Sequence, residues 1–415
     1  MLEPHFDRLR AEVGDAVRQP DFTTVRRRAG QVRRRRTATA SAVFLATVLT
    51  ATGLGYAVQN RPDHRTAPVT SDVPDDSWPR MTSTTATGKD LYGLLQRCRD
   101  CDPELYASPD AGASWQRRTE PPEPQDAGTP RDATLLAVAP GTVAWREGRT
   151  VPVAEALDPA SPATPDRWWI TSDGARTWRP VTTGTQPVTT VPAGSRPVDC
   201  DLLPLPACRV GALDPATGRT ALLAHQPTGI TIEGRWTSQT TVPLGGRLWV
   251  PGLDPVTNKP AVATSADAGR TWHTHVFTAA APAAPGHGAA ARPYVAAGPG
   301  ATAYVLTARA ADVVDAYYTT DGGLTWAAGD TIRDARPSGA FVAADGSHIV
   351  ATGTGFVAGR GTGRYTPVTL PGYPGQSAQI PQITSRPAAE PYLLPAETGP
   401  YLSRDGRTWR HVPRP

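Results

Sequence analysis

The sequence predicts an all-β fold, a seven-bladed β-propeller that follows a single N-terminal transmembrane helix. Two observations lead to this prediction. A short pattern recurs five times between residues 78 and 415, and an uncharged stretch over residues 37–58 is long enough to cross a bilayer. A repeat at intervals of tens of residues in a strand-rich chain is typical of propellers, in which each unit forms one blade.

The recurring pattern begins with Ser or Thr, has an Asp two positions later and ends with a Trp. Its five Asp–Trp pairs are Asp110 with Trp115, Asp173 with Trp178, Asp267 with Trp272, Asp321 with Trp326, and Asp405 with Trp409. Aromatic and β-branched runs flank the copies, for example at residues 167–170 and 316–318. Such runs, interrupted by Asp and Gly, predict a strand, a tight turn and a second strand.

Each residue type in the pattern has a structural task. The Asp carboxylate can accept hydrogen bonds from backbone N–H groups of the turn, and Gly supplies a positive φ angle. The Trp begins the return strand and packs its flat face against a neighbour. We therefore expect the five Asp residues to cap turns, and we assign no catalytic, cofactor-binding or metal-binding residue among them.

The pattern resembles the Asp-box, or BNR repeat, written S/T-x-D-x-G-x-T-W, of sialidases, sortilin-type receptor ectodomains and photosystem II assembly factors. The resemblance implies hairpins at the outer rim of a propeller, far from the central channel where propeller ligands usually bind. Two copies depart from the pattern. The second has Ala175 where Gly is usual, with Gly174 one step early, and the last is one residue shorter between Asp405 and Trp409.

The spacing of the copies predicts the number of blades. The five Asp residues are separated by 63, 94, 54 and 84 positions, and two of these gaps leave room for degenerate copies at residues 214–220 and 360–365. Seven units of about 48 residues then span residues 78–415, with six blades as the alternative if one faint copy is only a long loop. Each blade would be formed from consecutive chain, with the hairpin supplying its two outer strands.

The N-terminal residues predict a membrane anchor. Residues 1–36 form a basic cytoplasmic tail with ten Arg and five Asp or Glu, whereas residues 37–58 carry no charge. As a helix this segment would reach about 33 Å, enough for a hydrocarbon core of about 30 Å. Four arginines at residues 33–36 directly precede it, so the positive-inside rule predicts a single-pass cell-membrane protein with a cytoplasmic N-terminus and an extracellular propeller.

A cleaved signal peptide is the alternative to an uncleaved anchor, but the long tail and the long apolar stretch favour the anchor. Residues 59–77 follow as a linker in which Pro62, Pro68 and Pro74 favour a semi-extended chain. Beyond the tail the net charge is about −1, so we expect no nucleic-acid binding by the propeller at residues 78–415.

Four cysteines form two local pairs beyond the anchor, Cys98 with Cys101 and Cys200 with Cys208. Local pairs in an exported protein predict two short disulfides that staple loops. The Cys-x-x-Cys spacing of the first pair also occurs in redox centres and in zinc sites. No βαβ pattern surrounds it and the sequence has no second Cys-x-x-Cys, so the structural role is favoured and no cofactor is expected.

A sialidase activity would require catalytic residues besides the repeat. Sialidases resemble one another in an Arg-Ile-Pro motif, a triad of Arg residues that clamps the substrate carboxylate, a Tyr–Glu nucleophile pair and an Asp acid. This sequence has no Arg-Ile-Pro. Residues 78–81 read Trp-Pro-Arg-Met, and Arg-Pro pairs at 196–197 and 292–293 lack the family context. No catalytic residue is therefore assigned.

Two other sets of polar residues could belong to a site but also have ordinary structural interpretations. His273 and His275 would lie on one face of a strand, as metal ligands can, but no third ligand is visible nearby. Asp312 and Asp315 are expected to be loop acids or solvated strand ends. Neither set predicts a site.

The sequence thus favours a membrane-anchored extracellular β-propeller that acts as a non-enzymatic binding or scaffold module at the bacterial cell envelope. Its ligand would be a protein, a peptide or a glycan on one propeller face. The alternative is a sialidase-like glycoside hydrolase. That activity would need three convergent Arg residues, or two opposed carboxylates about 5–9 Å apart, at the central funnel.

Overall fold

The computed structural model describes residues 78–99, 101–122, 131–139, 141–149, 167–198, 208–232, 247–282, 293–310, 312–373, 382–383 and 392–415. The chain divides into two compact units, Met1–Asp72 and Val73–Pro415, and all described residues belong to the second. The tail, the segment 37–58 and the linker 59–77 lie outside the described residues, so the anchor stays a prediction. Within the described part of the chain, no helix is long and apolar enough to cross a membrane.

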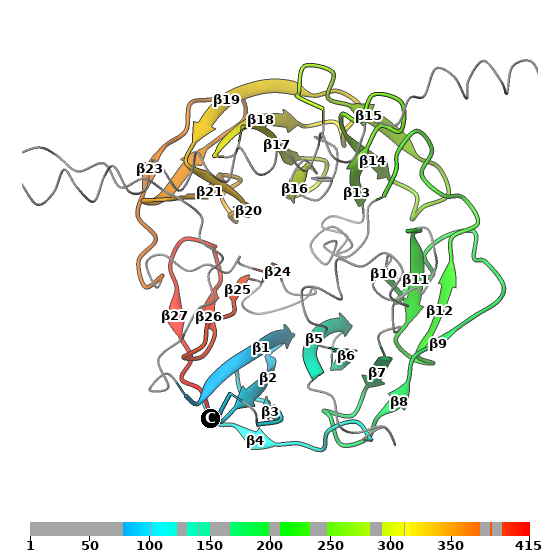
Figure 1. The fold of residues 1–415 in the computed structure, drawn as a ribbon, viewed down its shortest axis with the longest axis vertical. Coiled ribbons are helices and arrows are strands. Elements are labelled where there is room, and N and C mark those ends of the chain that lie inside the picture. Colours follow the sequence, from blue (N-terminus) through cyan, green and yellow to red (C-terminus); the bar gives the residue numbers. More distant parts are fainter. Residues whose placement is uncertain are drawn as a thin grey trace, which may run out of the picture. The chain divides into compact units, whose positions relative to one another are not determined.

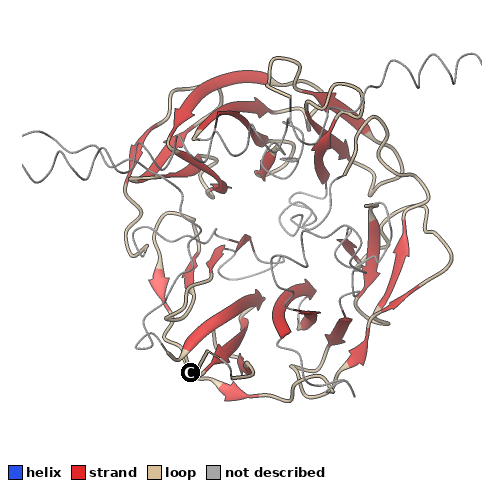
Figure 2. Ribbon diagram, viewed as in Figure 1, coloured by secondary structure: helices blue, strands red, loops and turns tan. Residues whose placement is uncertain are grey.

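Seven β-sheets surround a common centre (Figure 1), and every regular element of the described residues is a strand (Figure 2). The first sheet has β1 (Arg80–Thr87), β2 (Asp90–Gln96), β3 (Glu104–Ser108) and β4 (Gln116–Arg117). The second has β5 (Arg131–Ala139), β6 (Thr142–Arg149), β7 (Arg167–Thr171) and β8 (Arg179–Pro180). The third has β9 (Thr182–Thr183), β10 (Arg196–Val198), β11 (Gly211–Asp214) and β12 (Arg219–Leu222). The fourth has β13 (Leu248–Leu253), β14 (Pro260–Ser265) and β15 (His273–Val276).

The remaining three sheets have four strands each. The fifth has β16 (Tyr294–Ala297), β17 (Ala303–Ala310), β18 (Val313–Thr319) and β19 (Ala327–Arg333). The sixth has β20 (Ala335–Val342), β21 (His348–Thr352), β22 (Gly355–Gly359) and β23 (Thr366–Val368). The seventh has β24 (Gln382–Ile383), β25 (Tyr392–Leu394), β26 (Tyr401–Ser403) and β27 (Arg410–His411). The all-β, seven-bladed prediction is therefore confirmed, and the six-bladed alternative is wrong.

The composition of each strand follows its depth in the sheet. The middle strands carry continuous apolar runs because both of their faces are covered by neighbouring sheets. β13 and β14 are buried along their whole length, whereas the two-residue outer strands β4 and β27 are exposed.

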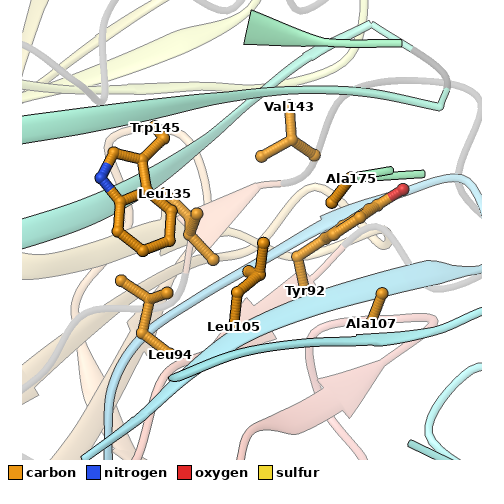
Figure 3. Packing of buried hydrophobic residues seen from close by; sticks show 8 residues of the cluster. All are labelled: Tyr92, Leu94, Leu105, Ala107, Leu135, Val143, Trp145 and Ala175. Carbon is orange, nitrogen blue, oxygen red and sulfur yellow. The ribbon is translucent and has the colours of Figure 1, made fainter. Parts of the chain in front are cut away.

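The core lies between adjacent sheets rather than at the centre of the ring. Figure 3 shows the cluster between the first and second sheets, made of Tyr92, Leu94, Leu105, Ala107, Leu135, Val143, Trp145 and Ala175. A similar cluster between the fourth and fifth sheets contains Trp249, Phe277 and Val305. Each blade is thus held by the two sheets beside it.

The third sheet differs from the expected order. Its outermost strand β9 precedes the inner strand β10 in the chain and pairs with β12 in parallel, which gives the order β10-β11-β12-β9. No hairpin supplies its two outer strands. Residues 214–220, predicted as a degenerate copy of the repeated turn, instead join the second strand β11 to the third strand β12.

The turn at Asp214 belongs to a second repeat. Residues 213–217 read Leu-Asp-Pro-Ala-Thr and join β11 to β12, and residues 253–257 read Leu-Asp-Pro-Val-Thr and join β13 to β14. The two turns are equivalent because Thr231 pairs with Leu253 in an isolated antiparallel bridge, which puts Thr231 in the inner-strand position of the fourth blade and β13 in the second. In each turn the carboxylate accepts a Thr hydroxyl, from Thr217 to Asp214 and from Thr257 to Asp254. The prediction failed because both kinds of turn are capped by an Asp carboxylate.

The first and seventh sheets meet without sharing a strand. Trp115 Nε1 donates to the Pro413 carbonyl oxygen at 2.9 Å, and the Met81 N–H donates to the Glu397 carbonyl oxygen at 2.9 Å. An apolar cluster that includes Leu91, Leu393 and Val412 fills the joint. Ring closure therefore rests on contacts between two complete sheets.

Candidate functional site

The blades present two chemically different faces. The start face carries the first residues of the inner strands and the turns between second and third strands. Hydrogen bonds across blade joints keep these ends together, from Ala335 N–H to the Asp312 carbonyl oxygen (3.0 Å) and from Met81 N–H to that of Glu397. The turn face carries the five Asp–Trp turns and the turns between first and second strands, joined by a bond from Ala344 N–H to the Asp405 carbonyl oxygen (3.0 Å).

The turn at residues 265–272 shows how each Asp–Trp turn is bonded. The Ser265 hydroxyl donates to Asp267 Oδ1 at 2.8 Å and accepts the Gly269 N–H at 2.8 Å. Asp267 Oδ1 also accepts the Thr271 N–H at 2.9 Å, while Oδ2 accepts the Thr271 hydroxyl at 2.6 Å. The polar groups are therefore satisfied within the turn.

The other four copies repeat this bonding in separate turns, each between the third and fourth strands of its blade. The carboxylates pair with Ser108 and Ser114 at Asp110, with Thr171 and Thr177 at Asp173, with Thr319 and Thr325 at Asp321, and with Ser403 and the Thr408 N–H at Asp405. Hydrogen bonds from the Ser114 and Ser108 side chains lower the pKa of Asp110 to about 2, and those from Thr271 lower the pKa of Asp267 to about 2. A carboxylate that is ionised at neutral pH and bonded within its own turn suits a turn cap better than a proton donor.

Packing explains why the second copy has Ala175 where the other longer copies have Gly. Each of the four longer copies has two consecutive residues with positive φ, and the second of them faces the preceding sheet. A Cβ on Gly269 would lie 2.4 Å from Leu223 Cδ1, and a Cβ on Gly112 would lie 2.1 Å from Val412 Cγ1. Ala175 occupies the same position with φ 63°, and its methyl group is buried in the cluster of Figure 3.

The shortened last copy keeps the turn with one residue fewer. Gly406 is its only described residue with positive φ, and its N–H donates to Ser403 Oγ at 2.8 Å across three positions instead of four. Asp405 Oδ1 accepts the N–H groups of Arg407 and Thr408, each at 2.8 Å.

Three of the five Trp residues also form a hydrogen bond to the preceding blade. The indole N–H of Trp115 bonds the Pro413 carbonyl oxygen, that of Trp178 bonds Thr119 (2.7 Å), and that of Trp272 bonds His225 (2.9 Å). Trp326 bonds within its own turn, to Gly323 at 3.2 Å. The repeated turn therefore assembles the ring, which gives its Asp and Trp side chains a structural task.

Arginines mark the start face. Four inner strands begin with one, at Arg80 in β1, Arg131 in β5, Arg196 in β10 and Arg336, the second residue of β20. Each pairs with the last or the penultimate residue of the second strand, so all four occupy equivalent positions in their blades. Arg196 belongs to one of the Arg-Pro pairs that the sequence showed, but only the strand register shows that its position is equivalent to those of the other three arginines.

β1 and β5 lie side by side with a fixed register. The Leu135 N–H donates to Ser83 Oγ at 3.0 Å and the Ala137 N–H donates to Thr85 Oγ1 at 3.1 Å. Residue numbers rise together along both strands, so Arg80 and Arg131 lie at the same end of neighbouring strands.

Two of these arginines are described in atomic detail. The Arg80 guanidinium lies 4.1 Å from the Trp78 ring centroid and 3.8 Å from Glu397 Oε1, and 27% of its side chain is exposed. Arg196 is buried. The start face thus combines one half-exposed cation, held over an indole, with a cation covered by the fold.

A Tyr–Glu pair with two arginines lies farther out on the same face. Tyr106 and Glu104 both belong to β3, the third strand from the centre, and the Tyr106 hydroxyl donates to Glu104 Oε2 at 2.9 Å. Arg97 donates from Nε to the same oxygen at 3.0 Å and from Nη2 to the Tyr106 hydroxyl at 2.9 Å. Arg117 Nη1 is 3.5 Å from Glu104 Oε1.

The electrostatics of this pair do not suit activation of a tyrosine. Burial works to raise the pKa of Glu104, but hydrogen bonds from Tyr106 and Arg97 outweigh it and lower the pKa below the usual value. A carboxylate with a lowered pKa is a weaker base towards the tyrosine hydroxyl. Burial raises the pKa of Glu120, whose Oε1 lies 3.9 Å from Arg117 Nη2.

The remaining sequence candidates occupy ordinary positions. Cys98 and Cys101 form the predicted disulfide. Cys208 is disulfide-bonded as well, whereas Cys200 lies outside the described residues, so that pairing stays a prediction. The expectation that Asp315 is a loop acid or a solvated strand end is wrong. Asp315 is buried in β18 and accepts a hydrogen bond from Arg309 Nε at 2.9 Å.

The two candidate histidines lie on β15, where burial lowers the pKa of His275 and its ring packs against Phe277 with centroids 4.9 Å apart. No group of three potential metal ligands occurs in the part of the chain that the structure describes.

No protein-family model and no curated protein matches the chain. Similar solved structures include "YCF48 bound to D1 peptide" (15% identity, 81% of each chain covered, TM-score 0.30) and the Hadza microbial sialidase Hz136 (15% identity, 69% of this chain and 64% of that chain, TM-score 0.34). Another is the Penicillium chrysogenum alpha-L-arabinanase complexed with arabinobiose (11% identity, 81% of this chain and 94% of that chain, TM-score 0.35). At these identities the similarity concerns the propeller fold and selects no function.

Proposed function

We propose that the chain is a non-enzymatic binding or scaffold module of the bacterial cell envelope, anchored to the membrane by residues 37–58, and that its ligand contacts the start face. The observation that carries this proposal is the equivalent placement of Arg80, Arg131, Arg196 and Arg336 at the beginnings of four inner strands. Loops and strand ends held on a rigid scaffold are where propellers and other β folds place their binding residues.

The turn face offers less for a ligand. Its five Asp carboxylates and their hydroxyl partners bond to one another within each turn, as in Asp267 with Ser265 and Thr271. A ligand would have to break these bonds before it could use the same groups. The Asp-box resemblance supports the same conclusion, because it implies that the hairpins serve the fold.

A sialidase-like hydrolase is the second candidate, and one observation favours it. Tyr106, Glu104, Arg97 and Arg117 bring together the residue types of a tyrosine nucleophile, its base and two carboxylate-binding arginines. Against it stand their place on the third strand and the lowered pKa of Glu104. The non-enzymatic function is therefore the better supported.

One pair of experiments distinguishes the two functions. The purified protein would be used to capture ligands from envelope extracts, with Arg80→Ala as the test variant and Arg270→Ala, an exposed arginine of the turn face, as the control. A ligand lost with Arg80→Ala and kept with Arg270→Ala supports binding at the start face. Hydrolysis of fluorogenic sialosides that disappears in Tyr106→Phe would establish the enzyme instead.

A further inference from the structure

Hydrogen bonds as well as the disulfide restrain the described residues around Cys98 and Cys101. The Gln96 side-chain amide donates from Nε2 to the carbonyl oxygens of Arg99 and Cys101, both at 2.9 Å. The Cys101 N–H donates to the Cys98 carbonyl oxygen at 3.2 Å. The Arg97 side chain, beside the first cysteine, is fixed by its bonds to Glu104 and Tyr106.

The disulfide itself adds little to such a loop. Its two cysteines are three positions apart, and a cross-link stabilises a fold less as the loop that it closes becomes shorter. The bonds of Gln96 already restrain the same residues. The bond is therefore poorly explained as a staple of the propeller.

The two cysteines differ in exposure. Cys98 is exposed, together with Arg97 and Arg99 on either side, whereas Cys101 is half-buried. An exposed cysteine is open to attack by an external thiolate, and the positive charges of Arg97 and Arg99 on either side favour the thiolate form of Cys98 once the pair is reduced. This asymmetry is what a thiol–disulfide exchange site requires.

We infer that Cys98–Cys101 is a redox-active dithiol whose co-substrate is an external thiol. The thiolate of that co-substrate attacks Cys98 Sγ and forms a mixed disulfide, the Cys98–Cys101 bond breaks, and Cys101 leaves as a thiolate. A second external thiolate then attacks the co-substrate sulfur of the mixed disulfide, which releases the oxidised co-substrate and leaves both cysteines reduced. The reverse sequence reoxidises the pair. The bonds of Gln96 to the carbonyl oxygens of Arg99 and Cys101 keep Cys101 in place throughout, so that the disulfide closes again readily.

A time course of reduction of the full-length protein in glutathione redox buffers tests the inference, with acid quenching, alkylation and peptide mapping of each cysteine. We expect Cys98 and Cys101 to be reduced at least tenfold faster than Cys208, with the near-ultraviolet circular dichroism unchanged. Reduction of Cys98–Cys101 only together with Cys208, or only on unfolding, would overturn it.

Single variants test the direction of attack. Cys101→Ser should accumulate a glutathione adduct on Cys98 at least tenfold faster than Cys98→Ser accumulates one on Cys101, and equal trapping contradicts the assignment. Gln96→Ala should slow reclosure of the reduced pair, with dithiothreitol-reduced protein as the starting state; an unchanged rate removes the role given to Gln96.

The double variant Cys98→Ser/Cys101→Ser separates exchange from stapling. It should keep the thermal unfolding midpoint of the parent, because Gln96 still holds the loop. A large loss of thermal stability would show that the disulfide is a structural staple and would contradict the proposal.

Discussion

Trp115 Nε1 and the carbonyl oxygen of Pro413 form a 2.9 Å hydrogen bond between residues 298 positions apart in the sequence. The same indole bond joins Trp178 to Thr119 and Trp272 to His225 between consecutive blades. At the joint of the first and seventh sheets, however, no connecting loop assists it. A single type of side chain thus serves both ordinary joints and the closing one.

Trp115→Phe removes the indole N–H and retains an aromatic ring. We expect the free energy of unfolding to fall by about 1 kcal/mol, the usual contribution of one hydrogen bond. Native-state hydrogen exchange should rise in β1–β4 and β25–β27, because the closing joint opens first. Trp178→Phe is the matched control. It should lose a similar free energy without selective exchange in the first and seventh sheets, and equal patterns in both variants would contradict the prediction.

Gly269→Ala should destabilise the protein by about 1–3 kcal/mol, because the new Cβ would lie 2.4 Å from Leu223 Cδ1 and the residue has φ of +91°. Gly346 provides the control, because it has φ of +82° but no atom lies within 4 Å of an added Cβ. Gly346→Ala should therefore cost only the backbone strain, about 1 kcal/mol. Urea denaturation of both variants measures the difference, and equal losses would show that backbone strain alone, and not the close approach of the preceding blade, explains the glycine at position 269.

His348 should make stability depend on pH. It is fully buried, stacks on Tyr304 and has Nδ1 2.5 Å from the Tyr365 hydroxyl, and burial lowers its pKa from 6.5 to about 3. Burial also raises the pKa of Tyr365, so the tyrosine keeps its proton and presents a neutral hydroxyl to Nδ1. The unfolded chain therefore binds more protons than the folded one between pH 6.5 and 3.

Stability attributable to His348 is present above pH 6.5 and is lost as the pH falls towards 3, with a slope of up to about 1.4 kcal/mol per pH unit. Denaturation curves at pH 7, 6, 5 and 4 should show this slope. His348→Phe should flatten it, whereas His273→Gln, at an exposed position on β15, should leave it unchanged. The same slope in both variants would assign the pH dependence to other groups.

Asp267→Ala removes the acceptor of three hydrogen bonds in one repeated turn and should cost about 1–2 kcal/mol at neutral pH. The pKa of Asp267 is about 2 in the folded protein against 3.8 for the free group, so its stabilisation is present above pH 3.8 and disappears as the pH falls through about 2. The difference between parent and variant should accordingly shrink in acid. Asp102→Ala, at an exposed aspartate outside the repeated turns, should show neither effect.

The fold could be predicted because the turn chemistry is local. A carboxylate, a hydroxyl and residues with positive φ bond within eight positions, so copies such as the one at Asp321 can be recognised without knowledge of distant contacts. Local chemistry also limited the prediction of which strands each turn connects. Asp214 caps a turn with Thr217 in the same manner, and only strand pairing shows that this turn joins different strands.

The start face could not be predicted for a related reason. Arg80 and Arg336 are far apart in the sequence, and nothing in their neighbours indicates that each pairs with the end of a second strand. The parallel strand β9 in the third sheet likewise depends on a long-range pairing with β12.

The joint between the first and seventh sheets also determines how the molecule would respond to force. A pull that separates these two sheets loads a few hydrogen bonds, among them Trp115–Pro413 and Arg410–Ala111, the Arg80–Glu397 ion pair and one apolar cluster, whereas unravelling a blade must break a whole strand ladder. The ring would part at this joint first and leave each blade intact, so its mechanical weakness has a fixed position and direction.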